Sequence, residues 1–226
     1  MNTEIVINSH LSSRKIEFGE LKKEGAMKHQ GTVTLETERL VLRRFTKNDL
    51  EQIYYNCWSE YDVWKWTNYA PMTCIAEVLT NAGMFTDNWI NAYERMNRYS
   101  WAIQLKETGE VIGRYFGMHP DDDIKQVELA CEIGKKWWNQ GLITEATKRI
   151  IEFFFKEVGM NRIYASHADK NPASGRMQEK SGMKYEGTLR QAEKCNGGIY
   201  DKIIYAVLAE DYFSNEVVNN SESYKF

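Results

Sequence analysis

The amino-acid sequence predicts a single α+β domain, with helices packed around a mixed β-sheet. The chain has 226 residues, which is enough for one domain with a full hydrophobic core and short for two. It contains three prolines and no Gly/Ser-rich tract, so nothing in it resembles an internal linker. Its periodic segments follow the order strand, two helices, three strands, helix, strand, helix and two strands. That order is typical of helices packed around one sheet.

Residues 1–31 mix charged residues, Gly and Ser without a sustained period, and we interpret them as an N-terminal extension. Over residues 39–43, apolar and charged residues alternate as in a half-buried strand. A helix is expected to begin at residues 46–49, whose Thr, Asn and Asp side chains suit a helix start. A connector rich in Trp and Tyr, residues 61–71, precedes a second helical stretch over residues 75–95.

Two apolar segments, residues 100–105 and 111–118, are expected to pair as a hairpin around a Thr-Gly turn. Apolar residues alternate with polar ones over residues 127–133, which predicts a further strand. Residues 142–158 form an apolar stripe at helical spacing, with Leu, Ala, Ile and Phe four positions apart. The short apolar run at residues 162–166 predicts the strand that follows this helix.

The last elements of the predicted order are bounded by proline and glycine. Pro172 suits the first position of a helix, where a missing N–H costs nothing, and Gly182 ends that helix. Residues 188–195 and 199–208 predict two strands, and the Asn-Gly-Gly turn between them is typical of a β-hairpin. Residues 214–226 form a polar tail that we expect to fray.

The composition argues against several classes of protein. The net charge is −3 and the pI is near 5.9, whereas proteins that bind nucleic acids are usually basic. The most apolar run, residues 150–155, contains Glu152 and is far too short to span a bilayer. The first twenty residues contain no apolar signal-peptide core. We therefore expect a soluble, cytoplasmic protein that binds neither nucleic acid nor a membrane.

The cysteines and histidines are scattered along the chain. No two cysteines form a C-x-x-C pair, and neither residue type has the spacing of metal ligands. We therefore expect neither a metal site nor a disulfide framework. The residues concerned are Cys57, Cys74, Cys131, Cys195, His10, His29, His119 and His167.

The stretch most informative about function is residues 134–142, between a predicted strand and a predicted helix. Such a turn directs unpaired backbone N–H groups and the positive end of the helix dipole at one point, where a diphosphate can bind. Lys135 and Lys136 add positive charge nearby. The alternative is structural: Asn139 caps a core helix and Gly141 turns the chain. One glycine alone does not decide between these interpretations.

Several sequence blocks match a known protein family. They are residues 35–43 (LETERLVLR), 144–146 (TEA), 171–174 (NPAS), 179–183 (EKSGM) and 186–190 (EGTLR). Together with Gly141, which matches the central glycine of the signature R/Q-x-x-G-x-G/A, these blocks resemble the GNAT superfamily of N-acetyltransferases, in particular its RimJ/RimL-like branch. Trp138 and Ile143 depart from that signature. The resemblance covers residues 34–212 and implies a GNAT domain over residues 32–213, with a mixed, mostly antiparallel sheet.

The resemblance implies that the protein binds acetyl-CoA as a co-substrate. The diphosphate of the coenzyme is expected at the turn before the central helix, where backbone N–H donors do not depend on side-chain identity. Asn171 suits a helix cap, and in this family its position also contacts the coenzyme arm. The coenzyme-binding positions implied by the family are Ile133, Trp138, Asn139, Gln140, Gly141, Leu142, Ile143, Thr144, Asn171 and Ser174.

The resemblance also implies two catalytic residues. Glu193 matches the glutamate that the RimL-like proteins place in an A-E-x-x-N-G hairpin, here residues 192–197, and is the expected general base. The alternative is an exposed acid on a solvated hairpin. Ser174 is expected to protonate the leaving thiolate, or else is simply a polar residue in the first turn of its helix. Glu128 and Glu132 share one strand face and are the fallback bases.

The leading hypothesis is acetyl transfer from acetyl-CoA to a primary amine by direct attack. The amine-bearing acceptor is either a protein N-terminus or a small-molecule amine. Two other hypotheses stay open: a non-catalytic acyl-CoA-binding module, which Ile143 favours, and an interaction protein that uses its Trp-rich surface. The aromatic rings of the connector either line the acceptor pocket or serve core packing or an oligomer interface, such as that of a homodimer. These rings are Trp58, Tyr61, Trp64, Trp66 and Tyr69.

Overall fold

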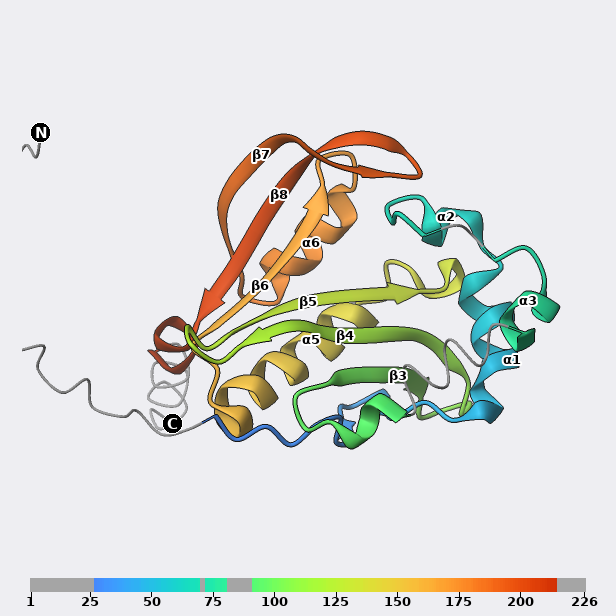
Figure 1. The fold of residues 1–226 in the computed structure, drawn as a ribbon, viewed down its shortest axis with the longest axis horizontal. Coiled ribbons are helices and arrows are strands. Elements are labelled where there is room, and N and C mark those ends of the chain that lie inside the picture. Colours follow the sequence, from blue (N-terminus) through green and yellow to red (C-terminus); the bar gives the residue numbers. More distant parts are fainter. Residues whose placement is uncertain (1–26, 70–71, 81–90, 215–226) are drawn as a thin grey trace, which may run out of the picture.

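The computed structural model describes residues 27–69, 72–80 and 91–214. Its strands are β1 (Leu35–Glu36), β2 (Leu40–Arg43), β3 (Tyr99–Leu105), β4 (Val111–Asp121), β5 (Gln126–Ile133), β6 (Arg162–Ala168), β7 (Lys184–Cys195) and β8 (Gly198–Leu208). They form one sheet in the order β1-β2-β3-β4-β5-β6-β8-β7 (Figure 1). Neighbouring strands run antiparallel except β5 and β6, which are parallel. The predicted α+β class with a mixed, mostly antiparallel sheet is confirmed.

The helices include short and irregular turns. They are α1 (Leu50–Ile53), α2 (Tyr61–Trp64), α3 (Ile75–Thr80), α5 (Leu142–Phe153) and α6 (Pro172–Lys180), with 3₁₀ turns η1 (Lys47–Asp49), η3 (Asn91–Glu94) and η4 (Lys135–Trp137) and π-helical turns η2 (Tyr54–Trp58) and η5 (Phe154–Val158). The carboxylate of Asp49 accepts hydrogen bonds from the N–H and the hydroxyl of Thr46, at 2.7 and 3.0 Å. These bonds satisfy a donor at the helix start, so the start expected at residues 46–49 is confirmed.

Several boundaries differ from the sequence-based expectation. The aromatic connector contains the helical turn α2, because Val63 and Trp64 are buried there and packing stabilises a turn too short to form alone. The helix expected over residues 75–95 is described only as α3 and η3, and residues 81–90 lie outside the described part. β7 begins at Lys184, earlier than expected. The sequence gives no signal for its first residues, because nearly all side chains of this strand are exposed and show no alternation of apolar and polar residues.

Of the expected N-terminal extension (residues 1–31) and polar tail (residues 214–226), the structure describes only residues 27–31 and residue 214. The N–H of Lys28 donates to the carbonyl of Val158 at 3.0 Å, and that of Gly31 donates to the carbonyl of Met96 at 2.6 Å. Residues 27–31 therefore lie against the sheet and its helix. Residues 1–26 and 215–226 lie outside the described part, so the roles expected for them stay predictions.

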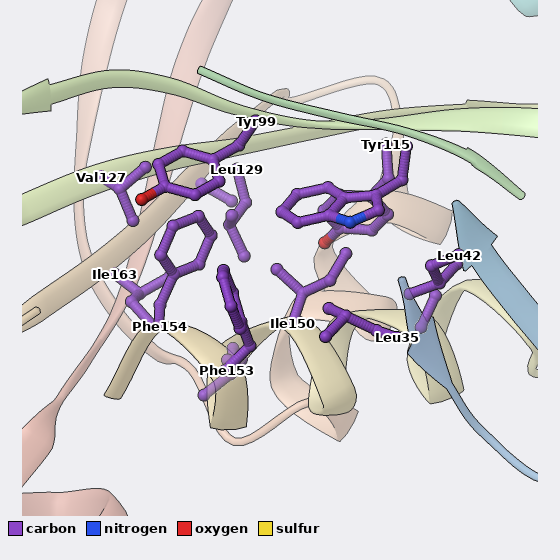
Figure 2. Close-up of a cluster of buried hydrophobic side chains, with 14 of the residues drawn as sticks. Leu35, Leu42, Tyr99, Tyr115, Val127, Leu129, Ile150, Phe153, Phe154 and Ile163 are labelled. Atoms are coloured by element: carbon purple, nitrogen blue, oxygen red, sulfur yellow. The ribbon is translucent and has the colours of Figure 1, made fainter. Parts of the chain in front are cut away.

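One face of the sheet is covered by α5 and its continuation η5. The expected apolar ladder is confirmed, since Leu142, Ala146, Ile150 and Phe154 are all buried. Figure 2 shows Ile150, Phe153 and Phe154 directed at side chains of the sheet. The ring of Phe154 lies edge-on to that of Tyr99, with centroids 4.8 Å apart. Burying each such side chain contributes about 2–3 kcal/mol, so α5 is firmly held on the sheet.

The opposite face is covered at one end by α1 and η2. Trp58 of η2 is fully buried, and its indole N–H donates to the carboxylate of Glu132 at 2.7 Å. Glu132 also pairs with the guanidinium of Arg114 on the neighbouring strand, at 2.8 Å. Because side chains alternate along β5, Glu132 faces away from the side on which Ile133 packs with α5. The sheet therefore separates α5 and α6 from α1 and α2.

Candidate active site

The two parallel strands at the centre of the sheet diverge along their length. β5 pairs with β6 only from Gln126 to Leu129. Beyond that point, the last four residues of β5 pair only with β4, and residues 166–168 of β6 pair only with β8. Figure 1 shows the two strands separating toward their carboxyl ends. We call this region the splay; it consists of residues 130–133 of β5 and residues 166–168 of β6.

The backbone of Ile133 presents an N–H group to the splay. The N–H of the next residue, Gly134, donates to the carbonyl of Ile112 at 2.9 Å, so it points toward β4. Because N–H directions alternate along an antiparallel ladder, the N–H of Ile133 points the other way, toward β6. The carbonyl of Ile133 accepts the indole N–H of Trp138 at 2.8 Å. The role of this N–H as an oxyanion donor stays a prediction.

The turn between β5 and α5 presents a run of unpaired backbone donors. After η4, Asn139 and Gly141 both have left-handed backbone angles, with φ of 61° and 76°. Within the described part of the chain, no atom accepts a hydrogen bond from the backbone N–H groups of residues 139–144. The last three of these residues form the first turn of α5 and lie at the positive end of its dipole. The turn therefore has the unpaired backbone N–H groups that the sequence predicts, and their binding of an anion stays a prediction.

Residues between β1 and β2, together with Glu145 of α5, hold this turn through side-chain hydrogen bonds. The guanidinium of Arg39 donates to the carbonyl of Gln140 at 3.0 Å and to the carboxylate of Glu145 at 2.7 Å. The hydroxyl of Thr37 donates to the same carboxylate at 2.5 Å. Sequence reasoning did not assign these residues a role at the turn. The signal was present in the family-like blocks that contain them, but only the fold brings the blocks together.

The two lysines of the turn both lie near acidic side chains, and their contribution to anion binding stays a prediction. The ammonium of Lys135 lies 2.6 Å from the carboxylate of Asp62, and that of Lys136 lies 4.0 Å from the carboxylate of Glu110. Both charges are therefore directed at acidic side chains, and Lys135 ties the turn to α2. The predicted anion site therefore rests on backbone donors and the helix dipole.

Asn171 and Ser174 lie at the start of α6, on the same side of the sheet as α5. The carbonyl of Asn171 accepts the N–H of Ser174 at 3.2 Å, so Asn171 occupies the cap position. Its side chain makes no capping hydrogen bond, so the prediction of a side-chain cap is wrong. The two helices touch where the hydroxyl of Thr147 approaches the sulfur of Met177, at 3.4 Å. The proton-donor role of Ser174 stays a prediction.

The three carboxylates considered as bases lie on the face of the sheet opposite α5. Glu128 and Glu132 share that face, as expected. Glu132 is 9% exposed and held by the ion pair with Arg114, so its carboxylate is occupied. Among the described residues, Glu128 accepts hydrogen bonds from two neutral hydroxyls, those of Ser166 at 3.3 Å and Tyr164 at 3.4 Å. Of these two acids, Glu128 has the contacts of a proton acceptor.

Glu193 lies in β7, near the tip of the hairpin that β7 forms with β8. Its carboxylate accepts hydrogen bonds from the hydroxyl of Tyr200 and the ammonium of Lys202, each at 2.5 Å. Partial burial raises the pKa of the Glu193 carboxyl, but the bonds from Lys202 and Tyr200 outweigh it and leave the pKa below its ordinary value. A lowered pKa makes a weaker base. The catalytic role of Glu193 stays a prediction.

A model of the acetyltransferase (GNAT) domain matches residues 39–184, which contain the splay and the turn. The chain belongs to the GNAT acetyltransferase family. The N-acetyltransferase p20 of Bacillus licheniformis is 30% identical over 179 residues, which cover 79% of this chain and 98% of p20. The protein YdaF of Bacillus subtilis (strain 168), described as a candidate ribosomal N-acetyltransferase, is 30% identical over 149 residues, covering 66% of this chain and 79% of YdaF. This relative is consistent with the RimJ/RimL-like branch.

The fold of this GNAT acetyltransferase is similar to solved structures as well. The structure of the microcin C7 self immunity acetyltransferase MccE, in complex with acetyl-CoA and AMP, superposes with a TM-score of 0.65. It is 19% identical and covers 76% of this chain and 93% of MccE, a likeness that shows the fold. Among the described residues of the enzyme, no helix has the length and apolar character needed to cross a membrane.

Trp138 occupies a position where this GNAT family usually has Arg or Gln, and its indole N–H donates a hydrogen bond to the carbonyl of Ile133. We expect Trp138→Phe to weaken coenzyme binding about fivefold, because the carbonyl of Ile133 loses one hydrogen bond worth about 1 kcal/mol while an aromatic ring is kept at this position. Isothermal titration with CoA measures the change. Trp66→Phe, the same substitution on the connector, is the control and is expected to leave the CoA affinity unaltered. Equal affinities for wild type and Trp138→Phe contradict the prediction.

Proposed function

We propose that this GNAT acetyltransferase moves an acetyl group from acetyl-CoA to a primary amine by direct attack. The observation that supports it most is the splay, because it opens the centre of the sheet beside the run of unpaired N–H groups at residues 139–144. A coenzyme on the α5 side and an amine on the opposite face can meet only where the sheet is open. The splay provides that meeting point.

The coenzyme is held on the side of α5 and α6. Its diphosphate accepts hydrogen bonds from the backbone of residues 139–144, and its arm extends into the splay past Asn171 and Ser174. Ile143 departs from the family signature, but its half-buried side chain packs against the hydrophobic core. It therefore does not cover the donors, which removes the feature that favoured a non-catalytic acyl-CoA-binding module.

Direct attack needs three things from the residues of the site: deprotonation of the amine, stabilisation of the oxyanion and protonation of the thiolate. A protein α-amine has a pKa of about 7.7–8 and costs about 1 kcal/mol to deprotonate at neutral pH, whereas a lysine amine costs about 4–5 kcal/mol. The N–H of Ile133 stabilises the tetrahedral oxyanion, and the hydroxyl of Ser174 protonates the departing thiolate. Burial raises the pKa of the Cys131 thiol at the splay to about 12. This thiol stays protonated, so an acetyl-cysteine intermediate is disfavoured.

The general base is one of two carboxylates on the acceptor face, Glu128 or Glu193. Protonating Glu193 gives up its ion pair with Lys202 and leaves that ammonium without its partner. Protonating Glu128 breaks no ion pair within the described residues, since its partners are the hydroxyls of Tyr164 and Ser166. The contacts therefore favour Glu128, acting directly or through one water.

The acceptor is a protein N-terminus or a small-molecule amine. The relative YdaF supports the first, since it is described as a candidate ribosomal N-acetyltransferase. The aromatic connector contributes little pocket surface from Trp58 and Trp64, which are buried. Tyr61 and Tyr69 are 60% and 67% exposed and are the connector rings that an acceptor can reach.

The test is to incubate the protein with acetyl-CoA and a panel of amines and peptides with free N-termini while thiol release is followed. Time-dependent thiol release that requires an amine, with the acetylated product seen by mass spectrometry, supports the proposal. Tight CoA binding without turnover on any amine overturns it in favour of a binding module. Absence of CoA binding overturns it in favour of an interaction protein.

A further inference from the structure

The tip of the β7–β8 hairpin is hydrogen-bonded to the aromatic connector. The side-chain amide of Asn196 donates to the carbonyl of Trp64 at 2.9 Å and to that of Tyr69 at 2.7 Å. Its backbone N–H donates to the carbonyl of Thr67 at 2.8 Å. The N–H of Gly197 donates to a further connector carbonyl at 2.9 Å. One asparagine thus supplies three of these four bonds between two segments far apart in the sequence.

The connector and the hairpin belong to opposite sides of the splay. Two contacts fix this part of the chain to the β5 side: the bond from Trp58, just before the connector, to Glu132, and the ion pair of Asp62, in the connector, with Lys135. The hairpin continues β8, which pairs with β6 on the other side. Figure 1 shows the hairpin tip beside α2, beyond the separating ends of β5 and β6. The bonds of Asn196 therefore join the two sides on the face opposite α5 and α6.

We propose that Asn196 is a positioning residue for the acceptor amine, an inference that rests on the proposed function. The hairpin bears Glu193 and Tyr200, which face the acceptor side, and the connector bears the exposed ring of Tyr69. Asn196 fixes these groups relative to one another across the splay. Within the described residues, its hydrogen bonds run to the carbonyls of residues 64, 67 and 69 and not to residues 139–144, so it acts on acceptor binding rather than on coenzyme binding.

The experiment compares Asn196→Asp with Asn161→Asp in the full chain. Aspartate has nearly the same shape as asparagine but donates no hydrogen bond, and it places a negative charge against two carbonyl oxygens. Asn161 is an exposed residue just before β6, at the opposite end of that strand from the splay, so the same substitution there serves as the control. Steady-state kinetics give KM separately for the acceptor and for acetyl-CoA, and thermal unfolding reports whether each variant is folded.

We expect Asn196→Asp to raise the acceptor KM about tenfold or more, as the loss of two hydrogen bonds predicts, with the acetyl-CoA KM unaltered. Asn161→Asp is expected to match the wild type in both constants. A folded Asn196→Asp protein with an unaltered acceptor KM overturns the inference, and so does an equal rise in both KM values. Amine-dependent turnover by the wild type in those two cases shows that the proposed function stands. Turnover by neither protein overturns the proposed function and this inference with it.

Discussion

Replacing Gly134 with alanine is expected to destabilise the protein by about 3 kcal/mol or more, at the upper end of what overpacking costs. A Cβ atom at this position would lie 1.8 Å from the backbone oxygen of Asn56 and 2.8 Å from a ring carbon of Trp137. Neither neighbour is the end of a flexible side chain, so the backbone of η2 or of the turn has to move. The movement disturbs the end of β5 and the N–H of Ile133 with it.

Urea unfolding followed by tryptophan fluorescence measures the loss of stability, and isothermal titration measures CoA affinity. Gly187→Ala is the matched control, because no atom of the described residues lies within 4 Å of a Cβ added there. Its free energy of unfolding is expected to stay within about 0.5 kcal/mol of the wild-type value. A Gly134→Ala protein with wild-type stability and CoA affinity contradicts the packing seen between β5 and η2.

Replacing Glu128 with glutamine is expected to lower kcat about a hundredfold or more, within the range that a general base supplies. The amide keeps the size of the carboxylate and can still bond the hydroxyls of Tyr164 and Ser166. The loss should therefore appear in kcat for amine acetylation, while the Kd for CoA stays unaltered. Pre-steady-state or steady-state thiol release at saturating acetyl-CoA measures it.

Glu193→Gln is the companion variant, since it makes the same change on the other candidate carboxylate. We expect a smaller loss, about tenfold or less, because this carboxylate is held by Lys202 and its lowered pKa suits it poorly for accepting a proton. The reverse order of the two effects assigns the base to Glu193. Small effects in both variants mean that the amine attacks in its already neutral form.

The fold could be predicted largely from the sequence because its elements have clear periods. The apolar ladder of α5 and the alternation in β5 identify a helix and a strand whose buried faces meet, and both are confirmed. The turn before α5 was predictable for a related reason: a strand, a glycine and a helix in close succession fix where unpaired N–H groups must point. These periods and this turn are set by residues close together in the sequence, so the sequence alone reveals them.

The side-chain partners within the site could not be predicted, because they join distant residues. The bond from Trp58 to Glu132 spans 74 positions and removes an acid that the strand pattern alone had offered as a base. The contact of Arg39 with Glu145 spans 106 positions, and that of Asn196 with Trp64 spans 132. Local pattern also misassigned Asn171, whose type favours a side-chain cap that its backbone position does not use.

The divergence of β5 and β6 leaves two short strand edges inside the molecule, with backbone groups that have no ladder partner. Unpaired strand edges of this kind can pair with other extended chains. A ligand lodged between them shields them and, by mass action, adds about 2.7 kcal/mol of folding free energy at a hundred times its Kd. The melting temperature and the shelf life of this protein should therefore rise with the concentration of CoA, and purification in its presence should limit aggregation.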